Sequence, residues 1–149
     1  MTVTVIGYAP GAYDMFHIGH LNILQRASRE CDHLIAGVVT DSVLLRVKGR
    51  TPVIPFDERL EIVRNIRCVA EAIPDQHEDK FRMWERLRYD VLFKGSDWRG
   101  TPRGAELEAK LRRVGARVRY FAYTRHTSST LLRQRISMPA PVALEPGPA

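Results

Sequence analysis

The sequence predicts a single α/β domain built on a doubly wound sheet of five parallel strands. Short apolar runs rich in β-branched residues alternate with helical segments, an order typical of parallel strands joined by right-handed crossovers. The run at 33–40 is almost continuously apolar, as expected of a strand buried on both faces. The chain of 149 residues is long enough for one such domain with its own core.

Each expected element follows from a local pattern. Apolar, β-rich runs predict strands at 3–8, 33–40, 71–74, 90–95 and 117–123. Helical spacing of apolar residues predicts helices at 21–28, 41–47, 56–67, 80–88, 105–114 and 129–136. Asp57, and Ser128 or Ser129, are suitable N-caps, and Gly115 is a suitable helix stop. We expect residues 1–137 to form the domain and the proline-rich segment 138–149 to be disordered.

Composition argues for a soluble cytoplasmic protein. Hydrophobic residues make up 44% of the chain and charged residues 27%, values ordinary for a globular domain. Since no apolar stretch reaches about 18 residues, we expect no membrane span, and no signal peptide is evident. Cys31 and Cys68 stand alone, which suits a reducing compartment.

The net charge of +6 indicates anionic partners. Lysines and arginines are spread through helices and loops, and no basic run with interleaved aromatics stands out. This distribution favours a site for an anionic nucleotide and an anionic second substrate over nucleic acid. A basic nucleotide- or nucleic-acid-binding module remains the alternative that is not an enzyme.

The loop at 11–20 is the strongest candidate for a functional site. It joins the first expected strand to the first expected helix, and His17 and His20 lie where that helix begins. A helix start presents free N–H groups and partial positive charge, which favour phosphate. Imidazoles add donors that can be charged or neutral near pH 7, and Gly19 lets the backbone approach a ligand closely. A zinc pair is the competing interpretation, but His33, His77 and His126 offer no obvious ligand spacing with these two.

Further candidates follow in chain order. Lys48 and Arg50 lie in a basic loop at 48–52 that could cover phosphates as a flap. Gly95 ends the fourth expected strand, at the carboxyl edge where open α/β sheets bind ligands. The hydroxyls at 128–130 mark a second helix start suited to phosphate, although ordinary N-capping also explains them.

His17-Ile18-Gly19-His20 after Asp14 resembles the H-x-G-H signature of the nucleotidyltransferase superfamily. More narrowly, the chain is similar to bacterial glycerol-3-phosphate cytidylyltransferases and to relatives acting on phosphocholine and phosphoethanolamine. The similarity runs from about residue 3 to about residue 136, and is strengthened by Lys48, Arg67, 95–98 and 127–130 in the expected order. It implies a Rossmann-like sheet that is not the dinucleotide type, because no G-x-G-x-x-G follows the first strand.

The resemblance implies transfer of CMP from CTP to a small phosphorylated alcohol with release of pyrophosphate. His17, His20 and Lys48 would be the catalytic residues, acting by charge stabilisation rather than as bases. Mg²⁺ would be carried mainly by phosphate oxygens, with Asp14 a possible ligand or a partner of an imidazole. A homodimer is also implied. The implied nucleotide-binding residues are Tyr13, Asp14, Gly19, Arg67, Gly95, Ser128, Ser129 and Thr130; for Arg67, complementing the helix dipole is an equal explanation.

The implied acceptor residues are Asp97, Trp98, Thr124 and Arg125. Here the chain departs from the family pattern R-T-x-G-x-S-T: the leading Arg is replaced by Tyr123 and the Gly by His126, so Arg125 becomes the candidate for the acceptor phosphate. The polar, cationic edge at 124–127 favours sn-glycerol 3-phosphate over phosphocholine or phosphoethanolamine. Two aromatics, Tyr123 and Trp98, could instead begin a cage for an ammonium group. Adenylyl transfer to another phosphate acceptor is a further alternative.

Overall fold

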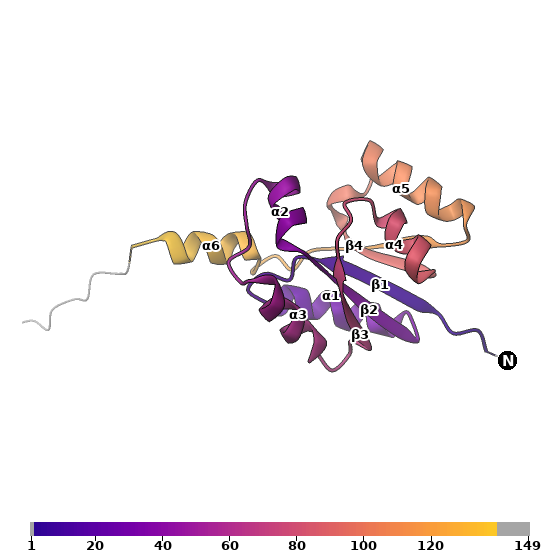
Figure 1. Ribbon diagram of the computed structural model, residues 1–149, viewed down its shortest axis with the longest axis horizontal. Coiled ribbons are helices and arrows are strands. Elements are labelled where there is room, and N and C mark those ends of the chain that lie inside the picture. The colour runs from indigo at the N-terminus through magenta and orange to yellow at the C-terminus, as the bar shows by residue number, and fades with distance from the viewer. Residues whose placement is uncertain (1, 140–149) are drawn as a thin grey trace, which may run out of the picture.

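The computed structural model describes residues 2–139, and it confirms the predicted fold class. Five parallel strands form one sheet in the order β3-β2-β1-β4-β5. Their bounds are β1 Ile6–Gly11, β2 His33–Val39, β3 Glu71–Asp75, β4 Val91–Gly95 and β5 Arg117–Phe121. The strand order reverses direction between β1 and β4, the switch point at which open α/β sheets bind ligands (Figure 1).

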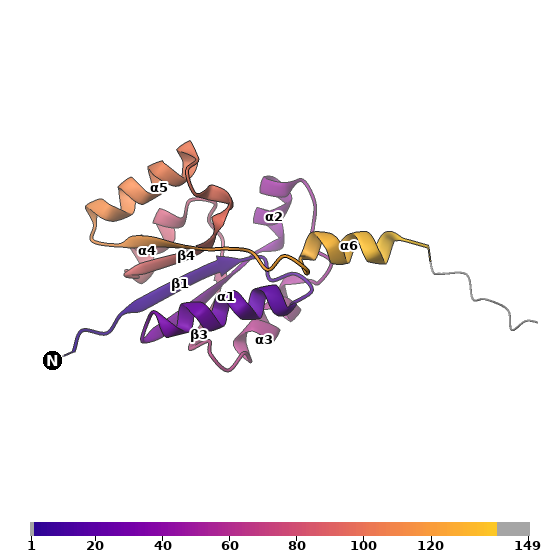
Figure 2. The ribbon, with the colours of Figure 1, turned by 180° about the vertical axis from the view of Figure 1, so that it is seen from behind.

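Helices cover both faces of the sheet, as a doubly wound fold requires (Figures 1 and 2). One core layer joins Leu24 of α1 and Val63 of α3 to the sheet, and the other joins Met83 of α4 and Leu111 of α5. Helices α2 and α6 follow β2 and β5 near the carboxyl edge. The bounds are α1 Ile18–Arg29, α2 Asp41–Lys48, α3 Phe56–Arg64, α4 Lys80–Leu87, α5 Pro102–Arg113 and α6 Ser129–Ser137, with a short 3₁₀ turn η1 at Ser96–Trp98.

The first strand and the first helix each begin a few residues away from the positions that the sequence predicted. The strand runs from 6 to 11 rather than 3 to 8, and the helix begins at Ile18 because His17 is its N-cap. Helix α3 begins after Pro55, so Asp57 lies in the first turn and is not the cap that was predicted. It ends at Arg64, which leaves Arg67 in an exposed turn beyond the helix. Pro74 lies within β3 rather than ending it, because β3 is an edge strand.

A buried polar cluster ties the sheet to α4. The Tyr8 hydroxyl donates to Oδ2 of Asp75 over 2.5 Å, and the Lys80 ammonium donates to the same oxygen over 2.8 Å. Gly37 leaves room for this arrangement, since a Cβ there would lie 2.0 Å from the Tyr8 hydroxyl. Each buried charge is therefore paired, which offsets the cost of removing it from water.

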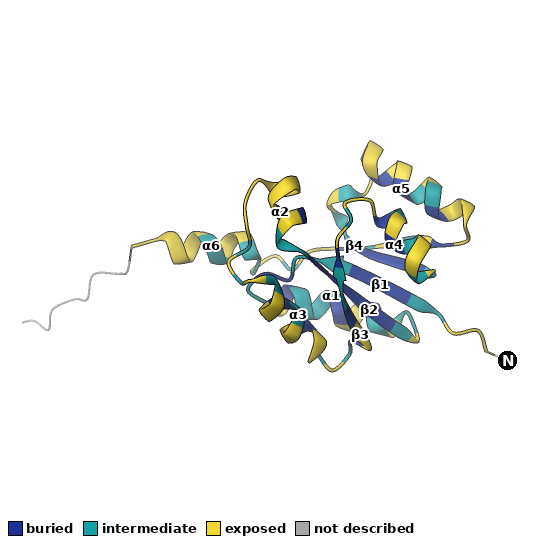
Figure 3. Cartoon of the chain, viewed as in Figure 1, coloured by how far each residue is buried: buried dark blue, intermediate teal, exposed yellow. Residues whose placement is uncertain are grey.

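Helix α6 differs from the other helices in its packing (Figure 3). None of its residues is buried, and it extends away from the body of the domain. Most of the predicted tail at 138–149 lies outside the described residues. In the part of the chain that the structure describes, no helix is both long and apolar enough to span a bilayer.

Candidate nucleotide-phosphate site

An open cavity of about 600 Å³ lies at the carboxyl ends of β1 and β4. Ligand pockets in proteins typically have this size. The loop after β1, the starts of α1 and α6, the end of α2 and the turn after β4 all contribute to its wall. Of the residues predicted for the site, it is lined by Tyr13, Asp14, His17, Gly19, His20, Lys48, Gly95, Asp97, Trp98, Thr124, Ser128, Ser129 and Thr130.

His17 has a structural role as well as a place in the cavity. Its Nδ1 accepts a hydrogen bond of 3.0 Å from the amide of Gly19, so the imidazole caps α1. Its own amide donates to Nδ1 of His20 over 3.3 Å, which completes a reciprocal capping box. The two rings stack with centroids 3.8 Å apart. Both histidines are thus fixed by the helix start that sequence analysis identified.

These hydrogen bonds assign the tautomer of both rings. Because each Nδ1 accepts a hydrogen bond, each neutral imidazole carries its proton on Nε2. The Ser129 hydroxyl agrees with this assignment. It donates to the carbonyl oxygen of Asp14 over 2.8 Å and lies 3.3 Å from Nε2 of His17, where it can accept.

Burial favours the neutral form of both histidines. Burial and the charges of His17 and Lys48 together lower the pKa of His20 to about 3, against an opposing effect of Asp14. Burial also lowers the pKa of His17. Of the two charge states that the sequence allowed, these shifts favour the neutral one. The imidazoles are therefore hydrogen-bond donors rather than cations.

Gly19 also has a structural role within the protein, beside the predicted close approach to a ligand. A Cβ on Gly19 would lie 2.8 Å from Cε1 and 2.9 Å from Nδ1 of His17. The missing side chain makes room for the capping imidazole, so Gly19 acts by positioning His17.

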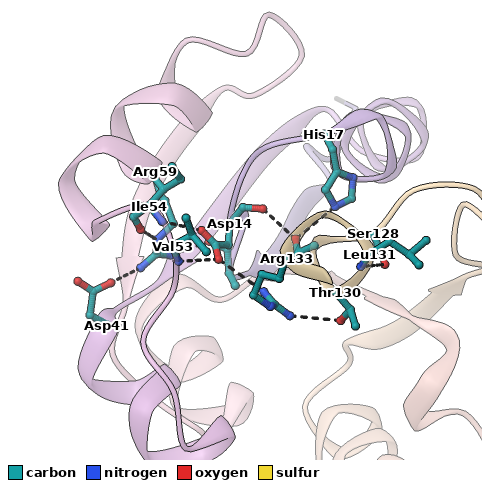
Figure 4. Close-up of polar contacts among 12 residues, drawn as sticks. Asp14, His17, Asp41, Val53, Ile54, Arg59, Ser128, Thr130, Leu131 and Arg133 are labelled. Carbon is teal, nitrogen blue, oxygen red and sulfur yellow. Dashed lines mark hydrogen bonds and ion pairs between the residues drawn. The ribbon is translucent and has the colours of Figure 1, made fainter. Parts of the chain in front are cut away.

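Asp14 holds the loop that follows α2 (Figure 4). Its carboxylate is buried and accepts from the amides of Val53 and Ile54 over 2.9 and 2.8 Å. Nη1 of Arg133 lies 3.6 Å from Oδ2 of the same carboxylate. These contacts assign Asp14 to positioning the 49–55 loop and α6. Orienting an imidazole, one of the two predicted roles, is not seen.

The backbone around Asp14 is unusual. Tyr13 and Met15, on either side of it, have φ angles of 53° and 51°, in the left-handed region that residues with a side chain rarely adopt. Such conformations persist where surrounding contacts fix them, and they concentrate at functional sites. Here the Tyr13 hydroxyl bonds to the carbonyl of Ala9 over 2.7 Å, which fixes one side of the turn.

Arg59 anchors the same region through its buried side chain. The sequence did not predict it as a residue of the site. Its side chain is completely buried and donates to the carbonyls of Ala12, Val39 and Ile54 at 2.6 to 2.9 Å. Nη2 adds a bond of 2.6 Å to Oδ1 of Asp41. One guanidinium thus joins the ends of β1 and β2, the start of α2 and the loop before α3.

Three cations lie near the helix starts. Lys48 is the last residue of α2 rather than part of the following loop, and Gly49 ends the helix with a φ of 69°. Partial loss of solvent and the charges of Arg50 and Arg133 lower the pKa of Lys48. All three side chains line the cavity. Arg133, on the first turns of α6, was not predicted, although it lies three residues after the Ser-Ser-Thr stretch and hence on the same helix face as Thr130.

The three hydroxyls at the start of α6 have separate partners. Ser128 caps the helix by accepting from the amide of Leu131 over 3.1 Å. Ser129 bonds to Asp14 and lies against His17, and Thr130 accepts from Nη2 of Arg133 over 3.2 Å. Capping therefore uses one hydroxyl, as expected. Ser129 connects the two helix starts, and Thr130 bonds within α6 (Figure 4).

The far wall of the cavity is formed after β4. The Tyr123 hydroxyl donates to Oδ1 of Asp97 over 2.8 Å, and Gly95 leaves space for it, since a Cβ there would lie 2.2 Å from that hydroxyl. The Trp98 ring carries two cations: Nζ of Lys94 is 3.7 Å and Cζ of Arg103 is 4.4 Å from its centroid. Neither cation was predicted, because each is brought to the ring by the fold.

Two predicted residues lie apart from the cavity. Arg67 is exposed in the turn after α3, and Arg125 is exposed in the loop after β5, and neither lines the wall. Thr124 does line it, and its Oγ1 accepts from the side-chain amide of Asn22 over 3.1 Å.

Few side chains around the cavity could ligate a metal ion directly. Within residues 2–139, no group of three or more His, Cys, Asp or Glu side chains could ligate an ion. This leaves no support for a zinc site at the two histidines. Asp97 faces the cavity with one carboxylate oxygen bonded to Tyr123. These residues fit Mg²⁺ carried on phosphate oxygens, with Asp97 the cavity carboxylate available to it.

Comparison with known proteins identifies the family of this chain. The sequence model of the cytidylyltransferase-like family matches residues 8–135, which include both helix starts and the whole sheet apart from the first residues of β1. The chain therefore belongs to the cytidylyltransferase-like family, within the nucleotidyltransferase superfamily. The narrower likeness to glycerol-3-phosphate cytidylyltransferases stays a prediction.

Two curated relatives illustrate the similarity. The bifunctional protein HldE of Granulibacter bethesdensis is 35% identical over 95 residues, which are 63% of this chain and 20% of that protein. The ethanolamine-phosphate cytidylyltransferase of Arabidopsis thaliana is 33% identical over 128 residues, 83% of this chain and 30% of that protein. The chain thus spans about a fifth to a third of the length of these relatives.

Solved structures share the fold. The lipopolysaccharide core biosynthesis protein from Thermoplasma volcanium superposes with a TM-score of 0.69 at 24% identity, covering 84% of this chain and 100% of that one. The pantoate-beta-alanine ligase from Francisella tularensis gives a TM-score of 0.65 at 12% identity, covering 87% of this chain and 65% of that one.

Proposed function

We propose that this chain transfers CMP from CTP to a small phosphorylated alcohol, sn-glycerol 3-phosphate first, and releases pyrophosphate. The observation that carries the proposal is the convergence of two helix starts with two neutral Nε2–H imidazoles and three cations on one cavity. A triphosphate needs such donors and charges, and a helix start supplies further N–H groups.

In the proposed reaction, an ionised oxygen of the acceptor phosphate attacks the α-phosphorus of CTP. The P–O bond to the β-phosphate breaks and pyrophosphate leaves. Because the attacking oxygen is already ionised at neutral pH, no general base is needed, and catalysis consists of positioning and charge stabilisation. The Nε2–H groups of His17 and His20 donate to the phosphates, while Lys48 and Arg133 balance charge on the leaving pyrophosphate. Mg²⁺ would neutralise further phosphate charge.

CTP is favoured over ATP by the cytidylyltransferase-like family and by the Arabidopsis relative, which is named as a cytidylyltransferase. The same relative makes phosphoethanolamine the second candidate acceptor. The environment of Trp98 argues against both ammonium-bearing acceptors. Its ring already carries Lys94 and Arg103, so it is a poor wall for a cage, and two cations beside it would repel an ammonium head. Lys94 and Arg103 thus take the place of Arg125, which does not line the cavity.

Pyrophosphate release measured with each of the four nucleoside triphosphates against four acceptors tests the proposal. The acceptors are sn-glycerol 3-phosphate, phosphocholine, phosphoethanolamine and a hexose phosphate. We expect the highest kcat/KM with CTP and glycerol 3-phosphate. Preference for ATP or for an ammonium-bearing acceptor would correct the substrate and keep the reaction class. No release with any combination would favour a binding module.

A further inference from the structure

The cavity contains a second group of cations on the opposite side of the sheet from the histidines. Along β4, Phe93 packs in the layer with α1 and Leu92 in the layer with α4 and α5. Side chains alternate along a strand, so Lys94 lies on the side of the sheet that packs against α4 and α5. Arg103 comes from the first turn of α5 and reaches the same ring of Trp98.

Most carboxylates near this second group have cationic partners elsewhere. Asp75 pairs with Lys80 over 2.8 Å and Glu78 lies 3.3 Å from Arg46, while Asp79 and Glu106 lie 3.8 and 3.4 Å from Lys110. Asp97 accepts from the Tyr123 hydroxyl at Oδ1 and keeps its second oxygen open. Within the described part of the chain, neither Lys94 nor Arg103 has a carboxylate oxygen within 4.0 Å, whereas Lys80 does. Two positive charges are thus held at a cavity wall by an aromatic ring and lack an acidic partner. Such an arrangement favours an external anion.

We propose that Lys94 and Arg103, supported by the Trp98 ring, bind the phosphate of the acceptor substrate. The inference rests on the proposed function and adds the residues that recognise its second substrate. The three cations near the helix starts, which are Lys48, Arg50 and Arg133, would then bind the triphosphate. Asp97 lines the same cavity as both groups, and its charge raises the pKa of Lys48 and of Lys94. The two groups thus match the two anions that must meet for transfer.

The ionisation of Lys94 supports this assignment. Burial and the charges of Lys80 and Arg103 together lower its pKa to about 8, against the opposing effects of Asp97 and Asp75. A bound phosphate would raise this pKa, because an opposite charge favours the ammonium form. The ammonium form is lost as pH rises through about 8 in the free protein, so acceptor binding should weaken above that pH. A phosphate monoester stays dianionic in this range, because its second pKa is about 6.

Kinetics of four variants test the assignment. We expect Lys94→Met to raise the KM for the acceptor at least tenfold and to change the KM for the nucleotide less than twofold. Arg103→Gln should act in the same direction. Lys94→Arg should keep acceptor binding and abolish its weakening between pH 8 and 9.5, because arginine stays charged. Arg113→Gln, on an exposed part of α5, is the matched control and should leave both KM values unchanged.

A direct binding measurement separates this inference from the proposed function. The chain has two tryptophans, so Trp84→Phe makes Trp98 the sole reporter of fluorescence. We expect glycerol 3-phosphate, and more weakly inorganic phosphate, to change this fluorescence, and Lys94→Met to remove the response. An unchanged acceptor KM in folded Lys94→Met, or a rise in the nucleotide KM instead, overturns the assignment. If the wild type releases no pyrophosphate but the Lys94-dependent response persists, the reaction is wrong and the anion site stands.

Discussion

The Ser129 hydroxyl donates a hydrogen bond of 2.8 Å to the main-chain carbonyl of Asp14 and lies 3.3 Å from Nε2 of His17. This one hydroxyl connects the start of α6 to the loop after β1 and to the start of α1. Because α6 buries none of its residues, its position depends on polar contacts of this kind, together with the approach of Arg133 to Asp14. The same set of interactions therefore determines both the geometry of the candidate phosphate site and the position of α6.

Ser129→Ala should accordingly affect turnover more than Ser128→Ala does. Ser128 caps α6, so its loss should cost about 1 kcal/mol of helix stability. Ser129→Ala removes the contact to His17 and the bond to Asp14, so we expect at least a tenfold fall in kcat. Steady-state kinetics with chemical denaturation of both variants measures this. Equal effects on kcat would show that both hydroxyls act only through the helix.

His17→Asn and His20→Asn test the imidazoles without removing the helix cap. Asn is a good N-cap, so His17→Asn should keep α1 intact, whereas His17→Ala would also lose the cap. Each loss of an Nε2–H donor should cost about 3–4 kcal/mol of transition-state stabilisation, roughly a hundred- to thousandfold in kcat. His126→Asn, in an exposed loop, is the control. Near-normal turnover in either folded variant would remove the histidines from the catalytic assignment.

The low pKa of His20 predicts a dependence of stability on pH. In the unfolded chain its pKa is about 6.5, and in the folded protein about 3, so below 6.5 the unfolded state binds more protons. The free energy of unfolding should fall as pH drops from about 6.5 towards 3. Melting temperatures of wild type and His20→Asn between pH 7 and 4 measure this. We expect the variant to lose less stability than the wild type, and parallel curves would contradict the assignment.

The parts of the candidate site that depend on local signals could be predicted from the sequence. His17, His20 and the hydroxyls at 128–130 lie at helix starts, where a few neighbouring residues determine both the helix boundary and the exposed N–H groups. The parallel sheet was equally predictable, because alternating apolar runs and helices leave few topologies open.

The parts that were missed depend on contacts between distant segments. Arg59 reads as an ordinary surface position on a helix, yet its partners are 5 to 47 residues away and its side chain is completely buried. Lys94 and Arg103 become a site only because α5 returns to the end of β4. Arg67 was assigned to the end of a helix that in fact stops at Arg64, and Arg125 belongs to a loop whose direction no local pattern determines.

Arg59→Lys should therefore be strongly destabilising although it preserves charge. Lysine lacks the planar fork that reaches three carbonyls and Asp41 together, so buried acceptors would lose their partners. We expect a loss of about 3 kcal/mol in the free energy of unfolding, measured by urea denaturation. Arg64→Lys, exposed on the same helix, should change it by less than about 0.5 kcal/mol. Similar losses in both variants would mean that Arg59 does not anchor the site.

Lys48→Ala and Arg125→Ala should separate the cations that face the cavity from those outside it. Lys48 lines the cavity with Arg50 and Arg133, and its pKa is lowered by burial and by their charges. Its removal should lower kcat and raise the KM for the nucleotide, each by about tenfold, because one charge facing the triphosphate is lost.

Arg125 is exposed and does not line the cavity, so Arg125→Ala should leave both KM values within twofold of wild type. Parallel titrations of nucleotide and acceptor measure the four constants. A selective rise in the acceptor KM of Arg125→Ala would restore the role predicted from sequence and require the 124–127 loop to close over the bound acceptor.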